Sequence, residues 1–118
     1  MDKFDLIVTV VNKNSSEPII KASKNAGAEG GTIVYGRGTG IRENKTLFGI
    51  PIEPEKEIIL TIVPQDITNQ VQEAIIQAGN LDQPGYGILF VLELKQVAGI
   101  CHLCMEESGQ SLQDTSEQ

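Results

Sequence analysis

Three glycines at alternate positions, Gly36, Gly38 and Gly40, follow a short β-branched run and are the residues best suited to chemistry. Glycine allows positive φ and lets a ligand approach the backbone closely, and backbone amides freed in this way can form an anion-binding nest. Residues 41–57 contain two prolines and have no helical period. A dinucleotide-binding fingerprint needs a helix directly after the glycines. The spacing therefore indicates either another kind of anion site or a glycine-rich turn without a ligand.

A second candidate site is a Cys-x-x-Cys segment near the end of the chain, formed by Cys101, His102 and Cys104. It supplies at most three soft ligands, whereas a structural zinc site has four. A reversible disulfide is one alternative, and two reduced, inert thiols are another, because persistent disulfides are rare in the cytosol. His102 is the only histidine, and no Ser-His-acid set is predicted.

Composition excludes several classes of function. The chain has 118 residues, 40% of them hydrophobic, and a net charge of −7, values expected for one globular domain. A negative chain is repelled by nucleic-acid phosphates and by anionic membrane surfaces. No apolar run is long enough to cross a bilayer, and the first residues lack the features of a secretory signal. We therefore expect a cytoplasmic protein that neither binds nucleic acid nor inserts into a membrane.

The hydrophobic periods alternate along the chain between those of strands and helices. One helix is predicted from a cap at Ser15 or Ser16 to Gly27, and a second from Asp66 to Gly79. Buried strands are predicted at residues 4–11, 31–35, 57–63 and 88–97.

The resulting order, β-α-β-β-α-β, predicts a ferredoxin-like α+β sandwich, an antiparallel four-stranded sheet with both helices on one face. We expect residues 1–100 to form this domain, with a long loop at about 37–56, and residues 101–118 to be a disordered tail. Alternating Ile, Leu and Val predict that the uncovered sheet face is also apolar. Glu53, Glu55 and Glu57 alternate at strand period and are predicted to be a solvated face; with Lys56 among them they make a poor metal site.

This arrangement, with a strand ending Gly-Gly-Thr-Ile-Val and the following Gly-Arg-Gly-Thr-Gly, resembles the PII signal-transduction superfamily. The resemblance covers residues 4–97. It implies a homotrimer whose inter-subunit clefts bind adenine nucleotides, and a long T-loop that controls a transporter or an enzyme. It implies no enzymatic activity and no obligatory cofactor.

The resemblance assigns nucleotide-binding roles to three groups of residues. One group lies near the adenine base, one lies on the T-loop, and one lies on the B-loop, which wraps the phosphates. Thr32, Ile7 and Ile62 match positions near the base and ribose. Those matched to the phosphates are Gly36, Gly38, Gly85 and Gly87. The family's T-loop arginine is displaced, with Arg37 between the glycines and Thr39 after them, and both are further candidates for nucleotide binding. Tyr86, between the B-loop glycines, is a candidate to stack on a base or to pack on the surface.

Three basic residues of the family are missing. Ile88 replaces the B-loop lysine, and Gly99 and Cys101 replace two arginines of the adjacent subunit. Each lost charge-assisted contact is worth about 1.5–3 kcal/mol, so the effector is expected to be AMP or ADP in preference to ATP. The T-loop has no tyrosine for modification.

The resemblance makes the T-loop the output element. The partner is expected to be the cytoplasmic face of a membrane transporter or a metabolic enzyme, with Arg42, Lys45 and Phe48 as contact candidates. The alternative function is a metal- or redox-responsive trimer of the same fold that uses the C-terminal cysteines.

Overall fold

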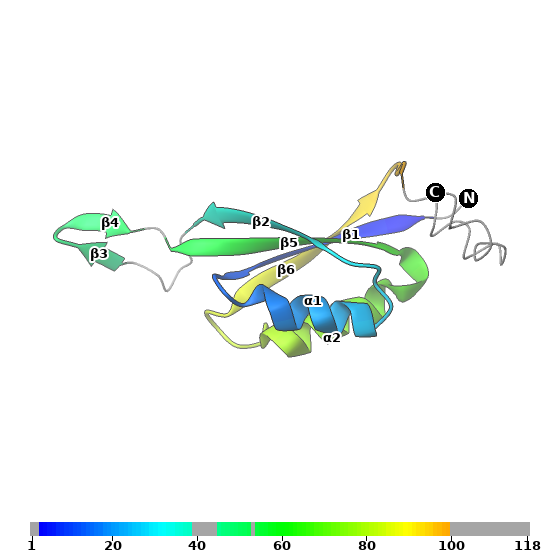
Figure 1. Ribbon diagram of the computed structural model, residues 1–118, viewed down its shortest axis with the longest axis horizontal. Helices are drawn as coiled ribbons and strands as arrows, with labels where there is room; N and C mark the ends of the chain where they lie inside the picture. Colours follow the sequence, from blue (N-terminus) through cyan, green and yellow to red (C-terminus); the bar gives the residue numbers. More distant parts are fainter. Residues whose placement is uncertain (1–2, 39–44, 53, 100–118) are drawn as a thin grey trace.

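The computed structural model describes residues 3–38, 45–52 and 54–99. Four strands form one antiparallel sheet in the order β2-β5-β1-β6, and the two helices cover one of its faces (Figure 1). The elements are β1 (Phe4–Asn12), α1 (Ser16–Asn25), β2 (Thr32–Arg37), β3 (Lys45–Leu47), β4 (Ile50–Ile52), β5 (Glu55–Pro64), the 3-10 turn η1 (Gln65–Ile67), α2 (Thr68–Gly79) and β6 (Gly87–Leu94). This is the predicted ferredoxin-like βαββαβ fold, and the prediction is confirmed.

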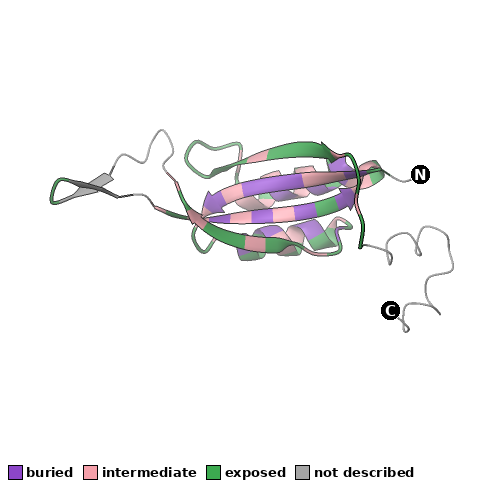
Figure 2. Cartoon of the chain, turned by 90° about the horizontal axis from the view of Figure 1, so that it is seen from above, coloured by how far each residue is buried: buried purple, intermediate pink, exposed green. Residues whose placement is uncertain are grey.

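Strand alternation divides the sheet into two faces. Odd-numbered residues of β1 and β5 face the helices, and most of them, such as Ile7 and Ile59, are buried. They pack against apolar residues of α1 and α2 to form the core, which includes Ile7, Val11, Ile19, Ile59, Val63, Val71 and Ile75. In Figure 2 the central strands alternate between buried and intermediate residues, while the outer strands are more exposed.

The face away from the helices, here called the open face, carries the even-numbered residues of the four strands. Most of them are apolar, as predicted from the alternation, and several are accessible to solvent in the single chain. The accessible members are Val34, Ile62, Ile88, Phe90 and Leu92, each 36–58% exposed. An apolar face of this kind is typical of a surface that another chain covers.

The helix ends differ from the predicted ones. Neither Ser15 nor any other side chain caps α1 locally, and the amides of Ser15 and Ser16 instead donate to Glu57 Oε1 at 3.2 and 3.0 Å. The cap predicted at Asp66 is wrong, because Asp66 lies inside the 3-10 turn and α2 begins after Ile67. The left-handed residue that ends α2 is Asn80, not Gly79.

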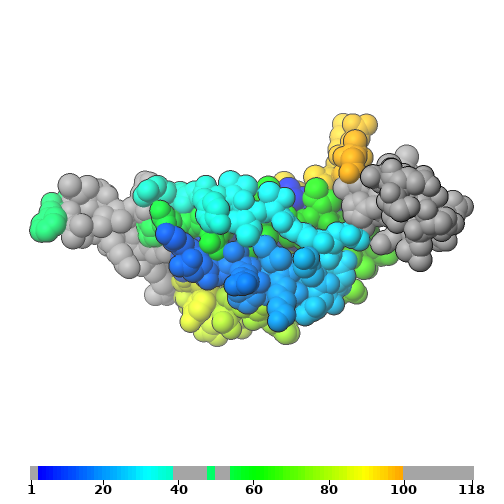
Figure 3. Space-filling view, in the orientation of Figure 1, coloured from blue at the N-terminus to red at the C-terminus, as the bar shows by residue number. Residues whose placement is uncertain are grey.

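The connection between β2 and β5, predicted as an irregular loop, contains the β3–β4 hairpin. Leu47 pairs with Ile50 across a two-residue turn at Phe48 and Gly49, whose φ angles are 53° and 80°. In Figures 1 and 3 this hairpin projects away from the sheet, with its green tip at the far left of the space-filling view. None of the helices in the described part of the chain is long and apolar enough to span a bilayer.

Candidate functional site

Four residues from separate parts of the chain line up across one end of the sheet. Gly36 of β2 is opposite Lys56 of β5, and Lys56 is opposite Asn12 of β1. Lys56 Nζ donates to Asn12 Oδ1 at 2.7 Å, and Asn12 Nδ2 donates to the Gly85 carbonyl oxygen at 3.3 Å. We call Gly36, Lys56, Asn12 and Gly85 the transverse row. It joins the start of the long β2–β5 connection to the loop before β6 and places an ammonium group between them.

Gly36 and Gly38, which were predicted to expose the backbone, do not have positive φ, contrary to the expected reason for glycine there. Gly36 lies within β2, and the amide of Gly38 donates to the Pro54 carbonyl oxygen at 3.2 Å, so it is not a free anion donor. A Cβ atom at Gly38 would meet no other atom within 4 Å. What glycine provides at position 38 is therefore open space beside the backbone.

The two glycines before β6 have different roles. Gly85 has φ of 86°, and a Cβ atom there would meet no other atom within 4 Å. At Gly87, with φ of 150°, a Cβ atom would lie 2.5 Å from the Val10 carbonyl oxygen and 2.9 Å from Val11 Cγ1. Gly87 is thus required by the pairing of β6 with β1, whatever binds nearby. Tyr86 between them is half exposed.

The residues predicted to lie near a base are spread over both faces of the sheet. Thr32 and Ile62 belong to the open face, where Thr32 is opposite Leu60. Ile7 faces the helices and is 0% exposed, in the core of the chain. Thr32 is four residues and Ile62 six residues along their strands from the transverse row, or roughly 13 and 20 Å at about 3.3 Å per residue. Within one chain, the structure does not bring these residues to the row.

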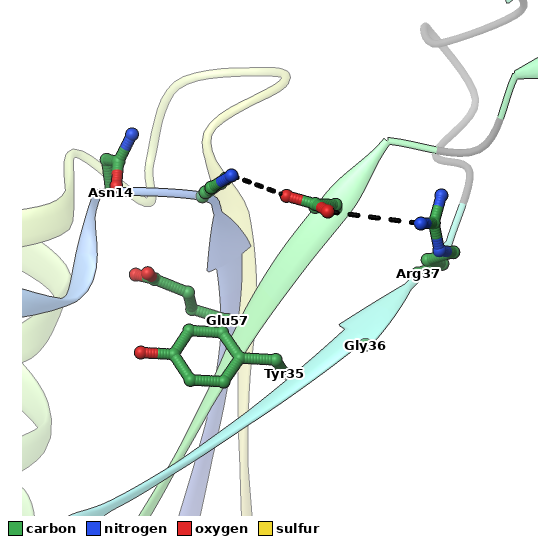
Figure 4. A pocket seen from close by; sticks show the side chains of 7 residues that line it. Asn14, Tyr35, Gly36, Arg37 and Glu57 are labelled. Atoms are coloured by element: carbon green, nitrogen blue, oxygen red, sulfur yellow. Dashed lines mark ion pairs between the residues drawn. The ribbon is translucent and has the colours of Figure 1, made fainter.

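A second feature, on the helix side of the same end, is an open hollow of about 510 Å³ (Figure 4). Tyr35 and Glu57 are opposite in register and both project into it. The hollow is lined by Lys13, Asn14, Tyr35, Gly36, Arg37, Glu55 and Glu57. Arg37, predicted to reach a phosphate, lies in this hollow rather than beside Lys56.

The charges at the mouth of the hollow pair with one another. Lys13 Nζ lies 2.8 Å from Glu55 Oε1, and Arg37 Nη2 lies 3.9 Å from Glu55 Oε2. The hydrogen bond and the charge of Lys13 lower the pKa of Glu55, and Glu55 in turn raises the pKa of Lys13. These side chains are 48–65% exposed, so the pairs add little to stability. They do leave Arg37 with a carboxylate partner.

At the inner end of the hollow, Glu57 is buried, so the prediction that it belongs to a solvated face is wrong. Glu55 is exposed as predicted, and Glu53 lies outside the described residues. Burial alone would raise the pKa of Glu57. Hydrogen bonds from Ser16 and from the amides of residues 14–16 outweigh that effect, so its pKa is lowered. The carboxylate is therefore ionised and committed to the start of α1, where the helix dipole also favours a negative charge.

Several predicted site residues lie outside the described residues. These are Thr39, Arg42, Cys101, His102 and Cys104, and the side chain of Lys45 is also not described. Among the residues that the structure does describe, no three His, Cys, Asp or Glu side chains gather where they could hold a metal ion. The metal- or redox-responsive alternative therefore stays a prediction.

Sequence reasoning missed Lys56 and Asn12. Lys56 was grouped with its acidic neighbours, although its even position in the strand places it on the opposite face from Glu55 and Glu57. The hydrogen bond between Lys56 and Asn12 depends on the register between β1 and β5, and a single sequence does not specify that register.

Comparison with known proteins gives one family and one shared fold. A family model described as nitrogen regulatory protein P-II matches residues 4–102. The crystal structure of a Bacillus cereus protein related to NIF3 superposes with a TM-score of 0.60 at 22% sequence identity, covering 80% of this chain and 26% of that one. At this identity the likeness shows a common fold alone, with this chain spanning about a quarter of the other protein's length. None of the curated proteins compared with the chain matches it.

Proposed function

The chain belongs to the nitrogen regulatory protein P-II family, and on that premise we propose that it binds an adenine nucleotide at the transverse row and thereby controls a partner protein. The observation that carries the proposal is the placement of the Lys56 ammonium group between Gly36 and Gly85. A cation in a row that ends in a glycine on each side suits a phosphate, because the phosphate can approach both the charge and the main chain of the glycines.

The charge of the site favours a nucleotide with few phosphates. Ile88 occupies the position of the family's B-loop lysine, and its side chain is apolar and 58% exposed. Arg37 is already paired with Glu55 on the other side of the sheet. With Lys56 as the cation of the row, AMP or ADP is the expected effector, since each further phosphate would add negative charge that this row does not neutralise.

A complete site requires a second copy of the chain. Thr32 and Ile62 lie too far along the strands from the transverse row to join it within one chain, but they share the open face with it. That face is apolar and exposed in the single chain. Packing of three copies through their open faces, as the family implies, would bury it and bring Thr32 and Ile62 of one copy toward the row of another.

The β3–β4 hairpin is the proposed output element, and its contact residue is Phe48. This side chain is 94% exposed at the tip of a hairpin that projects from the body. The start of the connection is Arg37 and Gly38, next to the transverse row, so a nucleotide there can favour one arrangement of the connection over another. The proposed partner is the cytoplasmic face of a transporter or a metabolic enzyme, with Arg42 and Lys45 as further contacts.

Calorimetric titration of the protein with adenosine, AMP, ADP and ATP, with and without Mg²⁺, tests the nucleotide proposal. The informative variant is Gly38→Val. The fold has room for the added side chain, but that side chain would occupy space beside the row that we assign to the ligand. Gly87→Val would not serve, since the added atoms would collide with β1. We expect the wild type to bind AMP or ADP, and Gly38→Val to lose binding while its thermal unfolding temperature stays the same.

Lys56→Gln provides a second arm. Loss of one charge-assisted contact should weaken ADP binding by about 10- to 100-fold, and the loss should be larger for ADP than for AMP. Lys21→Gln, on the helix α1, removes an equal charge away from the row and should bind like the wild type. Absence of nucleotide binding by the wild type, or undiminished binding by Gly38→Val, would overturn the proposal.

A further inference from the structure

We propose that Asn12 is a positioning residue that fixes the Lys56 ammonium group and couples the start of the β2–β5 connection to the loop before β6. The proposal rests on the proposed function for its ligand, a nucleotide phosphate. Its geometric basis is independent of that ligand. It consists of the two hydrogen bonds of one side-chain amide, to Lys56 Nζ at 2.7 Å and to the Gly85 carbonyl oxygen at 3.3 Å.

The surroundings of Lys56 explain why a positioning residue matters. A lysine side chain has many rotamers, and ordering it costs conformational entropy. On one flank its cross-strand neighbour is Gly36, which has no side chain. On the other flank the neighbour is Asn12, which accepts the ammonium hydrogen bond on the open face of the sheet. Asn12 therefore holds the charge toward the centre of the row, beside the loop before β6.

Asparagine is suited to this position because its amide has both a donor and an acceptor. Lysine only donates and a backbone carbonyl only accepts, so the two partners fix which end of the amide faces which group. Aspartate at position 12 would offer no donor to Gly85 and would place a negative charge beside the ammonium group. The neutral amide orders Lys56 without adding a negative charge beside its ammonium group.

The same bridge makes the two loops respond together. Gly85 has φ of 86° and open space around its α-carbon, and its carbonyl oxygen receives the Asn12 amide. An anion that draws the Lys56 ammonium group toward itself shifts the Asn12 amide, and through it the Gly85 peptide. The position of the loop before β6 then depends on whether Lys56 is occupied, although η1 and α2 separate this loop from β5 in the sequence.

The chain contains a natural probe for this coupling. It has two tyrosines and no tryptophan, and Tyr86 follows Gly85 directly and is half exposed. In a Tyr35→Phe background, tyrosine emission reports on Tyr86 alone. Without any ligand, Lys56→Gln should change this emission when Asn12 is present and should leave it unchanged when Asn12 is replaced by alanine. Equal changes in the two backgrounds would overturn the coupling.

Titration calorimetry with AMP and ADP gives the second readout. We expect Asn12→Ala to weaken ADP binding by about fivefold, and the Asn12→Ala, Lys56→Gln double variant to bind no more weakly than Lys56→Gln alone. Asn12→Asp, which preserves the size of the side chain, should weaken ADP more than AMP. Additive losses in the double variant, or equal losses for both nucleotides, would contradict a role exerted through Lys56.

The two proposals fail in distinguishable ways. If no nucleotide binds but the Tyr86 emission depends on Lys56 only through Asn12, the proposed function is wrong and the bridge stands. If nucleotides bind but the Tyr86 emission ignores Asn12, the bridge is wrong and the proposed function stands. Thermal unfolding of each variant controls for damage to the end of β1.

Discussion

At the scale of single residues, Glu57 shows how one side chain can connect distant parts of this sequence. It belongs to β5, yet it accepts hydrogen bonds from the amides of Ser15 and Ser16 at the start of α1. These amides belong to the set that every helix leaves without an intrahelical partner. Local capping by Ser15 was the sequence-based expectation; the structure uses a strand residue more than 40 positions away.

Glu57→Gln should reduce the free energy of unfolding at neutral pH by about 1 kcal/mol, because the amide accepts a hydrogen bond but carries no charge toward the helix dipole. The pKa of Glu57 is lowered in the folded chain, chiefly because the hydrogen bonds from Ser16 and the nearby amides outweigh its burial. Its contribution is therefore present above the unfolded pKa, about 4.3, and is lost as pH falls through the lower folded value.

Denaturant unfolding of the wild type and Glu57→Gln at several pH values measures this contribution. The difference between them should be constant from about pH 6 to 8 and should shrink as the pH falls below about 4. Glu73→Gln on α2, a residue exposed to solvent, is the matched control and should show no such difference. A difference that grows at acid pH would contradict the ionised cap.

The glycines show which features of the candidate site the sequence could predict. Of the predicted glycines, the structure places Gly36 and Gly85 at the same end of the sheet, where Lys56 and Asn12 link them. The structural reason for glycine at each position could not be predicted from the sequence. Gly87 is required by the nearness of β1, a tertiary contact, and Lys56 acquires its place only when the register between strands is known.

At the scale of elements, the hydrophobic period predicted every long strand and both helices. β1 and β5 were predicted to within a few residues because their apolar runs are buried and bounded by turn residues. The β3–β4 hairpin was missed because its strands have three residues each, too few to establish a period. Its turn also uses Phe48 at a position where asparagine or glycine is preferred.

Phe48→Asn should stabilise the hairpin. A bulky residue at φ of 53° is strained, whereas asparagine occupies the left-handed region readily. Phe48 is 94% exposed, so within the chain its ring has little packing to lose. Amide hydrogen exchange of residues 45–52 should become slower in the variant. Exchange that is unchanged or faster would show that the ring itself stabilises the turn.

At the scale of the whole molecule, the open face is the feature that the single chain leaves incomplete. Apolar alternation in the sequence predicted this face, and the structure exposes Ile88, Phe90 and Leu92 on β6. The number of copies that cover it is not encoded in the alternation, because the pattern specifies which side of a strand is apolar and not what packs on it. The trimer therefore remains a proposal that rests on family membership and on this exposed area.

Phe90→Glu tests the trimer directly. Phe90 lies on the open face, opposite Val8 of β1, and is 45% exposed in the single chain. A charge buried between copies without a partner is costly, so the variant should dissociate. Light scattering should give the mass of three 12.8 kDa chains for the wild type and of one chain for the variant. Val91→Glu places the same charge on the adjacent residue, 36% exposed on the helix side, and should remain trimeric. A monomeric wild type, or dissociation by Val91→Glu but not by Phe90→Glu, would show that copies do not meet through the open face.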